Sequence, residues 1–491
     1  MIASEAVPFA KTGGLADVAG SLPRALARLG QDVTLVLPRY RGIPVEGTPL
    51  RLPVMLGGRT LEAEIFLKPL GDGARVALID CPELYDREAL YGAENTDYPD
   101  NPRRFAFLAR AALEFVARTG EAVSILHAHD WQAGLVPVYL KTHYAAHPRL
   151  SEAASLLTIH NLAYQGLFPA EWLPTLDLGW EHFVQEGLEF WGQISFLKGG
   201  VNFAHLLSTV SPTYAREIQT PELGCGFDGI LSRRAADLHG VLNGIDVEVW
   251  DPARDEFLSE RYDAAHVEKK RAAKAALFEV LGLPAGNESL ARPLVGMVSR
   301  MIDQKGLDLI AAATGELLGL VAGFAVLGTG EERYQAMWRD LAARHPDRIA
   351  ARIGFDERLA HLIEAGADIF LMPSRFEPCG LSQMYSMRYG TVPVVRATGG
   401  LEDTVQNYDP RTGKGTGFTF RPYTPAALFG ALGRALDTFR KPKVWKTLQL
   451  AGMRQDFSWD RSAREYVKLY EKAVAARRTG AARPNVSRKE R

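Results

Sequence analysis

The fold class is decided by one stretch, Asp368-Ile-Phe-Leu-Met-Pro-Ser-Arg-Phe-Glu-Pro-Cys-Gly-Leu381. The run after Asp368 is apolar, which predicts a buried strand that ends at Pro373. From Leu381 to Met387 the apolar residues recur at helical spacing, which predicts a helix directly after the turn. Strands that alternate with helices in this way are typical of a parallel α/β sheet.

The turn between the predicted strand and helix carries one carboxylate, Glu377. The first amides of a helix lack intrahelical partners and the helix dipole is positive there, so the start of a helix binds anions. A carboxylate beside such a position indicates a ligand with a hydroxylated part and a phosphate part. The alternative is an ordinary strand–turn–helix joint with a solvated glutamate.

The composition is that of a globular protein with large cores, because 47% of its 491 residues are hydrophobic. This length is compatible with two or three domains. A net charge of −1, from 57 Lys and Arg against 58 Asp and Glu, argues against nucleic acid as the main partner. Three widely spaced cysteines, with no signal-peptide or membrane-spanning pattern, predict a soluble cytoplasmic protein.

The amino-terminal region contains a glycine-rich turn, Lys11-Thr-Gly-Gly-Leu-Ala-Asp17, followed by helical spacing as far as Gly30. A short apolar strand, residues 32–37, comes next, and this order predicts a crossover unit of a parallel sheet. The two glycines let the backbone approach a ligand and the lysine supplies a cation, unless the glycines serve only the turn. Only Met1 and Ile2 are left to form the strand before this turn, so we expect a frayed strand or a truncated chain start.

Polar side chains follow three further predicted strands. They are Asp130 and Trp131 after residues 124–129, His160 and Asn161 after residues 156–159, and Ser211 after residues 206–210. Because open α/β sheets bind ligands at the carboxyl ends of their strands, these residues are candidates for a site, although a lone histidine is often structural. His127 and His129 share one strand face, but no third ligand pattern lies near them, so we predict no metal.

The alternation of strands and helices starts a second time, with strands predicted at 294–298, 324–327, 349–353, 369–372 and 392–395. We therefore predict two Rossmann-like lobes that face a deep cleft, with a boundary near 241–250. The predicted parts are an amino-terminal lobe (1–241), a carboxy-terminal lobe (242–458), a helix packing back on the first lobe (459–476) and a disordered basic tail (477–491).

Two cations of the second lobe, Arg300 and Lys305, lie five residues apart. A guanidinium fork and an ammonium at this spacing suit a diphosphate, and the alternative is two surface cations on a loop. The motif Thr398-Gly-Gly-Leu401 echoes the glycine-rich turn of the first lobe, which fits two similar lobes. Cations with helix amides indicate a diphosphate, and carboxylates with histidine and asparagine indicate a hydroxyl-rich group. Together they indicate a nucleotide-sugar whose diphosphate is the leaving group.

Several segments resemble those of the bacterial-type glycogen (starch) synthases, over about residues 3–470. They are 11–17, 127–132, His160-Asn161, 243–246, 299–306, 377–381 and 398–401. The resemblance implies the GT-B fold, ADP-glucose as donor and an α-1,4-glucan such as glycogen as primer, extended at its non-reducing ends. It also implies a retained anomeric configuration and neither a metal nor another cofactor.

The resemblance also assigns residues to roles. It makes Glu377 the essential carboxylate of a catalytic group with His160, Asp130, and the two diphosphate cations Arg300 and Lys305. The positions that match contacts to donor, glucose or phosphate are Lys11, Gly14, Asp17, Trp131, Asn161, Asn243, Gln304, Cys379, Gly380 and Leu381.

Two mechanisms retain configuration, a covalent carboxylate intermediate and a same-face substitution assisted by the phosphate. We favour the second, in which Glu377 orients the sugar and stabilises positive charge at its ring. The alternatives to this function are a related retaining glycosyltransferase that uses UDP-glucose or a small acceptor, and a catalytically silent glucan-binding protein.

Overall fold

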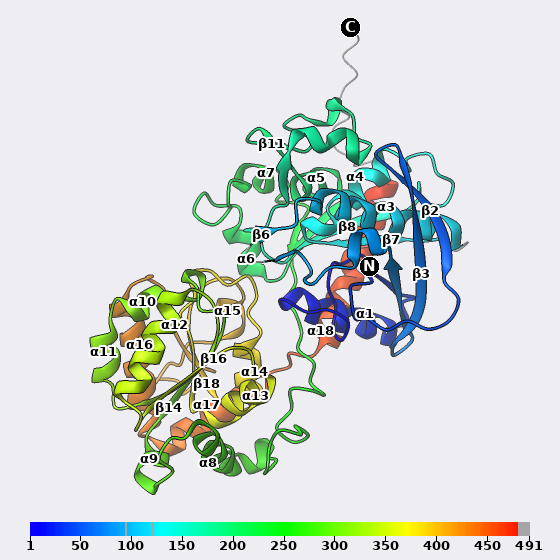
Figure 1. The fold of residues 1–491 in the computed structure, drawn as a ribbon. Coiled ribbons are helices and arrows are strands. Elements are labelled where there is room, and N and C mark those ends of the chain that lie inside the picture. Colours follow the sequence, from blue (N-terminus) through cyan, green and yellow to red (C-terminus); the bar gives the residue numbers. More distant parts are fainter. Residues whose placement is uncertain (94–95, 120–121, 480–491) are drawn as a thin grey trace. The chain divides into compact units, whose positions relative to one another are not determined.

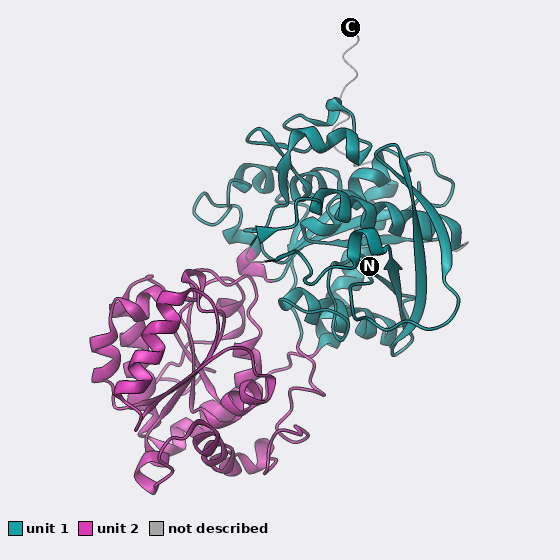
Figure 2. Ribbon diagram, in the orientation of Figure 1, with its two compact units in different colours: residues 1–210, 215–244, 459–491 teal, residues 211–214, 245–458 magenta. Residues whose placement is uncertain are grey.

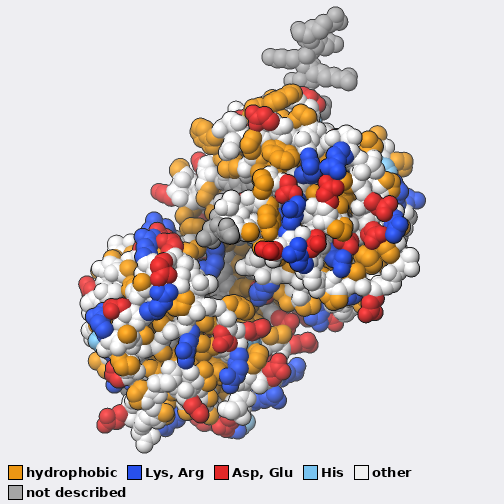
Figure 3. Space-filling model, viewed as in Figure 1, with side chains coloured by type: hydrophobic (Ala, Val, Ile, Leu, Met, Phe, Trp, Pro, Cys, Tyr) orange, Lys and Arg blue, Asp and Glu red, His pale blue; other side chains and the backbone are white. Residues whose placement is uncertain are grey.

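A computed structural model describes residues 1–93, 96–119 and 122–479 and divides the chain into two compact units (Figure 2). Unit 1 contains Met1–Val210, Ala215–Gly244 and the chain from Trp459 onward. Unit 2 contains Ser211–Tyr214 and Ile245–Ser458. Each unit is therefore a domain with its own sheet. Figure 3 shows basic and acidic side chains interspersed over the visible face of each unit, in keeping with the near-zero net charge.

Unit 1 is built on a sheet in which Ile2 lies at the centre. Two four-stranded parts, ordered β13-β12-β8-β7 and β1-β4-β3-β2, are joined by Ile2, which pairs in parallel with Ala128 and Val36. The strands are β1 (Thr34–Pro38), β2 (Leu50–Leu56), β3 (Arg59–Gly71), β4 (Ala74–Asp80), β7 (Ile125–His129), β8 (Ala154–Ile159), β12 (Leu206–Thr209) and β13 (Leu238–Gly240).

The short segment at the amino terminus, expected to be frayed, is ordered in the described structure. Ile2 is only 2% exposed. Its N–H donates to the His127 carbonyl at 2.8 Å, and its carbonyl accepts from the His129 N–H at 3.1 Å. Two buried neighbours thus hold a strand that is too short to be convincing from sequence. Reading outward from Ile2 gives β1 and β4 on one side and β7, β8, β12 and β13 on the other. This is the Rossmann strand order, with its topological switch point between Ile2 and β7.

Helices flank the sheet of unit 1, and the antiparallel β2–β3 hairpin extends one edge (Figure 1). The α-helices are α1 (Gly14–Arg28), α2 (Pro82–Tyr85), α3 (Asn101–Thr119), α4 (Leu135–Lys141), α5 (Phe196–Phe203), α7 (Asp228–Arg233) and α18 (Trp459–Arg478), with α6 (Pro212–Glu217) shared by both units. A small sheet contains β9 (Leu167–Pro169), β10 (Glu189–Phe190) and β11 (Gln193–Ser195), and β5 (Gly92–Ala93) pairs with β6 (Thr96–Asp97).

Helix α18 returns from unit 2 and packs on unit 1. Its buried residues recur at helical spacing, and they share one core with Val18, Leu22 and Leu26 of α1. The helix continues through Arg478, beyond the predicted end at residue 476, because Arg477 bonds to Ser151 and Glu152. The rest of the predicted basic tail, residues 480–491, lies outside the described residues.

Unit 2 has one parallel sheet with the order β16-β15-β14-β17-β18-β19 (Figure 1). Its strands are β14 (Leu294–Val298), β15 (Gly323–Gly328), β16 (Ile349–Ile353), β17 (Ile369–Met372), β18 (Val392–Arg396) and β19 (Phe418–Phe420). In chain order this is 3-2-1-4-5-6, so the topological switch point lies between β14 and β17. The five strands expected in this lobe are confirmed, and β19 was not predicted.

Both faces of this sheet are covered, which explains why its strands read as continuous apolar runs. Alternate residues of the strands belong to two separate cores. One face carries α10 (Leu307–Ala311), α11 (Thr314–Gly319), α12 (Glu332–Arg344) and α16 (Pro425–Phe439), and the other carries α8 (Lys270–Leu281), α13 (Glu357–Gly366) and α14 (Ser382–Arg388). The remaining helices are α9 (Asn287–Ala291), α15 (Gly399–Thr404) and α17 (Pro442–Met453).

Candidate active site

Four of the predicted site residues of unit 2 lie on two loops that flank its switch point. Arg300, Gln304 and Lys305 follow β14, and Glu377 follows β17, so neighbouring parallel strands deliver all four to the carboxyl edge of the sheet. Open α/β sheets bind ligands at this place, because the two adjoining crossovers leave on opposite faces and open a crevice between the loops.

Glu377 and Lys305 form an ion pair at the centre of this edge. The Lys305 ammonium lies 2.6 Å from Oε2 of Glu377, which also accepts a hydrogen bond from the Ser374 hydroxyl at 2.9 Å. The Glu377 residue is only 6% exposed, so its carboxylate is held in one orientation by these two donors. The sequence predicts separate roles for the two residues, Lys305 as a cation for phosphate and Glu377 as a group for the sugar. The structure brings the two into direct contact.

Close contacts between their backbones hold together the loop after β14 and the loop after β17. Gly306, with φ of +78°, sits where a Cβ atom would be 2.1 Å from the Pro373 carbonyl oxygen, so only glycine fits beside the end of β17. Arg300 donates to the side-chain oxygen of Gln304 at 3.3 Å. The amide of Gln304 in turn faces the Phe376 carbonyl at 3.5 Å, and it thereby connects the loop after β14 to the turn that carries Glu377.

The motif Thr398-Gly-Gly-Leu401 supports this turn from behind. A Cβ atom on Gly399 would be 1.9 Å from the Glu377 carbonyl oxygen, and one on Gly400 would be 2.1 Å from that of Cys379. The Gly400 N–H lies 3.2 Å from the Glu377 carbonyl. The two glycines therefore serve close packing at the start of α15. The glycine-rich turn of unit 1 resembles this motif in sequence but does not share this packing role.

The turn after Glu377 leads directly into α14. Cys379 is buried, Gly380 has φ of +70°, and Leu381 is the residue that precedes the first turn of the helix. This arrangement confirms the strand–turn–helix joint predicted from the sequence. It sets the first amides of α14 at the same edge as Arg300 and Lys305, so cations and a helix start meet where an anion would bind.

Sequence analysis missed Phe355, which follows β16 at this edge and is 84% exposed. In the sheet β16 lies two strands away from β14, which is about 10 Å. A flat exposed ring on a loop two strands away from the loop of the two cations suits the base of a nucleotide whose diphosphate lies at the switch point. The available signal was an aromatic residue placed directly after a predicted strand end.

Replacing Phe355 by alanine is expected to weaken ADP binding by about tenfold, because base–aromatic stacking contributes about 1–3 kcal/mol. The maximal rate should change little, since the ring is remote from Glu377 and Lys305. Titration calorimetry with ADP, together with steady-state kinetics, measures both effects. Phe355→Trp should keep the affinity, and Val321→Ala, which removes an exposed apolar side chain before β15 at the other edge of the sheet, is the control. Unchanged affinity in Phe355→Ala would remove the ring from the site.

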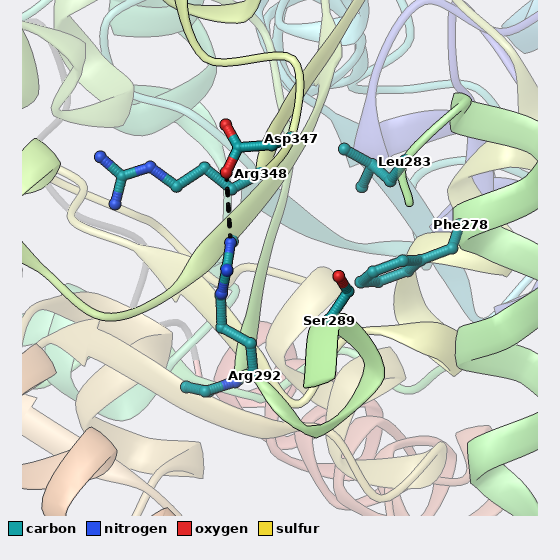
Figure 4. A pocket seen from close by; sticks show the side chains of 8 residues that line it. Phe278, Leu283, Ser289, Arg292, Asp347 and Arg348 are labelled. Atoms are coloured by element: carbon teal, nitrogen blue, oxygen red, sulfur yellow. Dashed lines mark ion pairs between the residues drawn. The ribbon is translucent and has the colours of Figure 1, made fainter. Parts of the chain in front are cut away.

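A pocket at the opposite edge of this sheet belongs to a different part of unit 2 (Figure 4). It lies beside the amino ends of β14, β15 and β16, and Arg292 reaches across it to within 3.6 Å of Asp347. The remaining lining residues are Phe278, Leu283, Ser289, Pro293, Gly323 and Arg348. None of the predicted site residues lines it, so we assign it no part in the reaction.

In unit 1 the glycine-rich turn follows the central strand and is fixed by Glu5. One carboxylate oxygen of Glu5 accepts from the Thr12 N–H at 2.5 Å, from the Thr12 hydroxyl at 2.9 Å and from the Gly13 N–H at 3.3 Å. Burial raises the pKa of Glu5, and these donors oppose that shift. Glu5, seven residues before Thr12, was not among the predicted site residues. A glutamate shortly before a glycine-rich turn was the signal.

The turn supplies three predicted site residues, Lys11, Gly14 and Asp17, which lie in different environments. Lys11 is exposed, and its ammonium lies 2.7 Å from the Asp17 carboxylate in the first turn of α1. Gly14 is the first residue of that helix. Lys11 is thus on the carboxyl side of the central strand, as a site residue must be, and its ion pair with Asp17 directs its side chain.

Asp130 is buried at the end of β7 and holds the next loop by its backbone. Its carboxylate accepts the His160 N–H at 2.7 Å, and the Asn161 N–H is a second backbone partner. The residue adopts φ of +55°, an unusual conformation for a side chain other than glycine. The geometry therefore shows Asp130 holding the backbone of His160, and the catalytic role that the resemblance implies for Asp130 stays a prediction.

Burial raises the pKa of Asp130 from 3.8 to about 7. Between these values the folded protein binds a proton that the unfolded chain has lost, so this group makes folding stability fall as pH rises. Asp130→Asn removes the group and should gain stability over wild type by up to about 1.4 kcal/mol per pH unit across that window. Thermal unfolding of both proteins at several pH values measures this difference. Asp32→Asn, at an exposed carboxylate of unit 1 that pairs with Arg75, is the surface control, and curves for Asp130→Asn parallel to those of wild type would contradict the prediction.

The other predicted residues of unit 1 lie in three environments. Trp131 is buried, and its ring packs edge-on against Phe105 at 4.9 Å, which makes it part of the core beside the site. Asn161 bonds to the Ala163 N–H and closes its own turn. Asn243 is 6% exposed, and its side-chain oxygen has no hydrogen-bond partner among the described residues. That oxygen is a candidate acceptor for a ligand hydroxyl.

Known protein families match both units of this chain. The family model of the starch synthase catalytic domain matches residues 1–233, and that of group 1 glycosyl transferases matches residues 284–447. A glycogen synthase of Anaeromyxobacter dehalogenans (strain 2CP-C) is 51% identical over 96% of this chain and 98% of its own. The chain belongs to the glycogen synthase family. A family member from Syntrophotalea carbinolica (strain DSM 2380 / NBRC 103641 / GraBd1) is 47% identical over 96% of this chain and 98% of its own.

Solved structures place the chain in the GT-B class of glycosyltransferases, as predicted. The catalytic domain of starch synthase IV from Arabidopsis thaliana, bound to ADP and acarbose, aligns with a TM-score of 0.88 at 34% identity. The alignment covers 96% of this chain and 98% of that one. Sucrose-phosphate synthase from Thermosynechococcus elongatus aligns at 0.60 with 18% identity, covers 97% and 98% of the two chains, and supports the fold alone. Within the described ranges no helix is both long and apolar enough to cross a membrane.

Proposed function

We propose that this family member transfers glucose from ADP-glucose to the non-reducing ends of an α-1,4-glucan such as glycogen, with retention of configuration. The observation that carries the proposal is the carboxyl edge of unit 2, where Arg300, Lys305 and the start of α14 adjoin Glu377. A relative whose structure contains ADP and acarbose supports a nucleotide and a carbohydrate as ligands.

The chemistry follows from the charges at this edge. Cleavage of the bond to the anomeric carbon leaves negative charge on the departing diphosphate, and fixed cations stabilise that charge without reorganising. Arg300 supplies two parallel donors and Lys305 a point charge. When a diphosphate binds, Lys305 can bridge it to Glu377, since the ammonium carries three donors and one carboxylate oxygen takes only one of them.

Glu377 is proposed to orient the sugar and to stabilise positive charge at its ring. A carboxylate pinned by both an ammonium and a hydroxyl is suited to a fixed electrostatic role, because an attacking carboxylate has to leave such donors. The acceptor hydroxyl then attacks on the face from which the diphosphate leaves, with a phosphate oxygen taking its proton. Trapping a glucosyl–Glu377 adduct would overturn this assignment.

Unit 1 is proposed to hold hydroxyl-rich groups. His160, Asn161 and Asn243 offer neutral donors and acceptors at the ends of its strands, and Lys11 adds a cation. Neutral polar side chains suit sugar hydroxyls, because they form hydrogen bonds without the desolvation cost of burying a charge.

Comparing donors tests this function against its two rivals. Purified protein should incorporate glucose into glycogen from ADP-glucose at least about tenfold faster than from UDP-glucose, at concentrations below saturation. A preference for UDP-glucose, or for a small acceptor over glycogen, would favour a related glycosyltransferase. Glycogen binding without incorporation from either donor would favour a silent glucan-binding protein.

A further inference from the structure

A histidine outside the predicted site, His129, contacts His160 inside unit 1. The Nδ1 atom of His129 lies 2.9 Å from Nε2 of His160, and the two rings are 5.2 Å apart. His129 is completely buried, and His160 is 9% exposed. Because Asp130 already holds the His160 backbone, this contact fixes the ring as well.

Both imidazoles are neutral in the folded protein. Burial lowers the pKa of His160 to about 3 and lowers that of His129 well below its ordinary value. A neutral imidazole carries one N–H donor and one acceptor nitrogen. In the hydrogen bond between the two rings, one nitrogen therefore donates its hydrogen and the other accepts it. The position of that hydrogen decides which nitrogen of His160 can donate to a ligand.

The other nitrogen of His129 settles the direction of the bond. Its Nε2 atom is buried and has no hydrogen-bond partner among the described residues. A buried N–H group without an acceptor is rarer in proteins than a buried acceptor without a donor. The proton of His129 therefore resides on Nδ1 and is donated to His160, whose Nε2 accepts it. The proton of His160 is then on Nδ1.

We infer that His129 is a positioning residue that fixes His160 as the Nδ1–H tautomer, so that His160 presents a hydrogen-bond donor to the sugar. This rests on the proposed function insofar as a sugar is the ligand. The described hydrogen bonds engage the ring of His160 at Nε2 and its backbone N–H, which leaves Nδ1 for a ligand. His160 then acts as a neutral donor to a hydroxyl oxygen and takes no proton from the substrate.

The neighbouring His127 provides a matched control. It lies on the same face of β7, its ring is 4.1 Å from that of His129, and it is equally buried. Its nitrogens are engaged elsewhere, by the Thr158 hydroxyl at 2.6 Å and the Tyr470 hydroxyl at 2.9 Å. Leucine at position 127 therefore disturbs the same core without removing the donor to His160.

Two measurements test the inference on the full chain. Nitrogen-15 NMR of histidine-labelled protein, without substrate, should show His160 as the Nδ1–H tautomer in wild type and in His127→Leu. In His129→Leu the single tautomer should be lost. Steady-state kinetics with ADP-glucose and glycogen should show kcat reduced about tenfold to a hundredfold in His129→Leu, with ADP affinity unchanged. His129→Asn should recover most of kcat, because its amide nitrogen can occupy the place of Nδ1.

The outcomes separate this inference from the function on which it rests. An Nε2–H tautomer of His160 in wild type would overturn the inference, and so would wild-type kcat in His129→Leu. A wild-type protein that transfers no glucose from ADP-glucose would overturn the proposed function. The NMR comparison would still decide the tautomer in that case.

Discussion

A Glu377→Gln variant is expected to lose about 10³-fold in kcat while it still binds ADP. Glutamine keeps the shape of the side chain but removes the charge that, in our proposal, stabilises positive charge at the ring of the transferred sugar. ADP affinity should be kept or increased, because Lys305 is freed from its 2.6 Å ion pair and becomes fully available to the diphosphate. Steady-state kinetics with ADP-glucose and calorimetry with ADP measure the two effects separately.

A second glutamate of unit 2 serves as the control for this variant. Glu268 pairs with Lys446 at 3.4 Å on the surface, and Glu268→Gln should leave both kcat and ADP affinity unchanged. Thermal unfolding checks that Glu377→Gln is folded, since the substitution leaves a partly buried ammonium without its partner. A folded variant with kcat within tenfold of wild type would exclude the proposed charge stabilisation.

Removing both diphosphate cations, in the double variant Arg300→Ala and Lys305→Ala, should abolish measurable turnover. Each cation is expected to contribute about 10²-fold or more to kcat/KM, because each stabilises charge that develops on the leaving group. The single variants should show intermediate losses, with higher KM for ADP-glucose. Initial rates across a range of ADP-glucose concentrations measure these effects.

Two comparisons sharpen this prediction. Arg300→Lys keeps the charge but not the two parallel donors, and it should recover only part of the loss of Arg300→Ala. Arg344→Ala removes an exposed arginine of α12 that pairs with Asp340, and it should behave as wild type. Full activity in the double variant would show that the diphosphate is stabilised elsewhere.

The parallel sheet of unit 2 could be predicted from the sequence because its strands are buried on both faces. Four of the five predicted strands are apolar runs, the edge strand β16 carries the exposed Arg352, and each strand lies within a residue of its predicted bounds. Strand β19 was missed because only Phe418, Thr419 and Phe420 form it. At the amino terminus, Ile2 gives no pattern by itself, and its place is set by β1 and β7.

Residue types and strand ends were enough to nominate most of the candidate site, but not the contacts among its members. Two of these contacts depend on packing between loops far apart in sequence. They are the ion pair of Lys305 with Glu377 and the hydrogen bond from the His160 N–H to Asp130. Glu5 and Phe355 were missed for a related reason. A single glutamate or phenylalanine has many structural uses, and only its position at a sheet edge marks it as part of a site.

The most direct test of the account is a structure of the protein crystallised with ADP. We predict that the diphosphate lies at the switch point of unit 2, within hydrogen-bond distance of both Arg300 and Lys305 and of the amides that begin α14, with the base against Phe355. A diphosphate that contacts neither Arg300 nor Lys305 would contradict the central claim that this edge of unit 2 binds the donor.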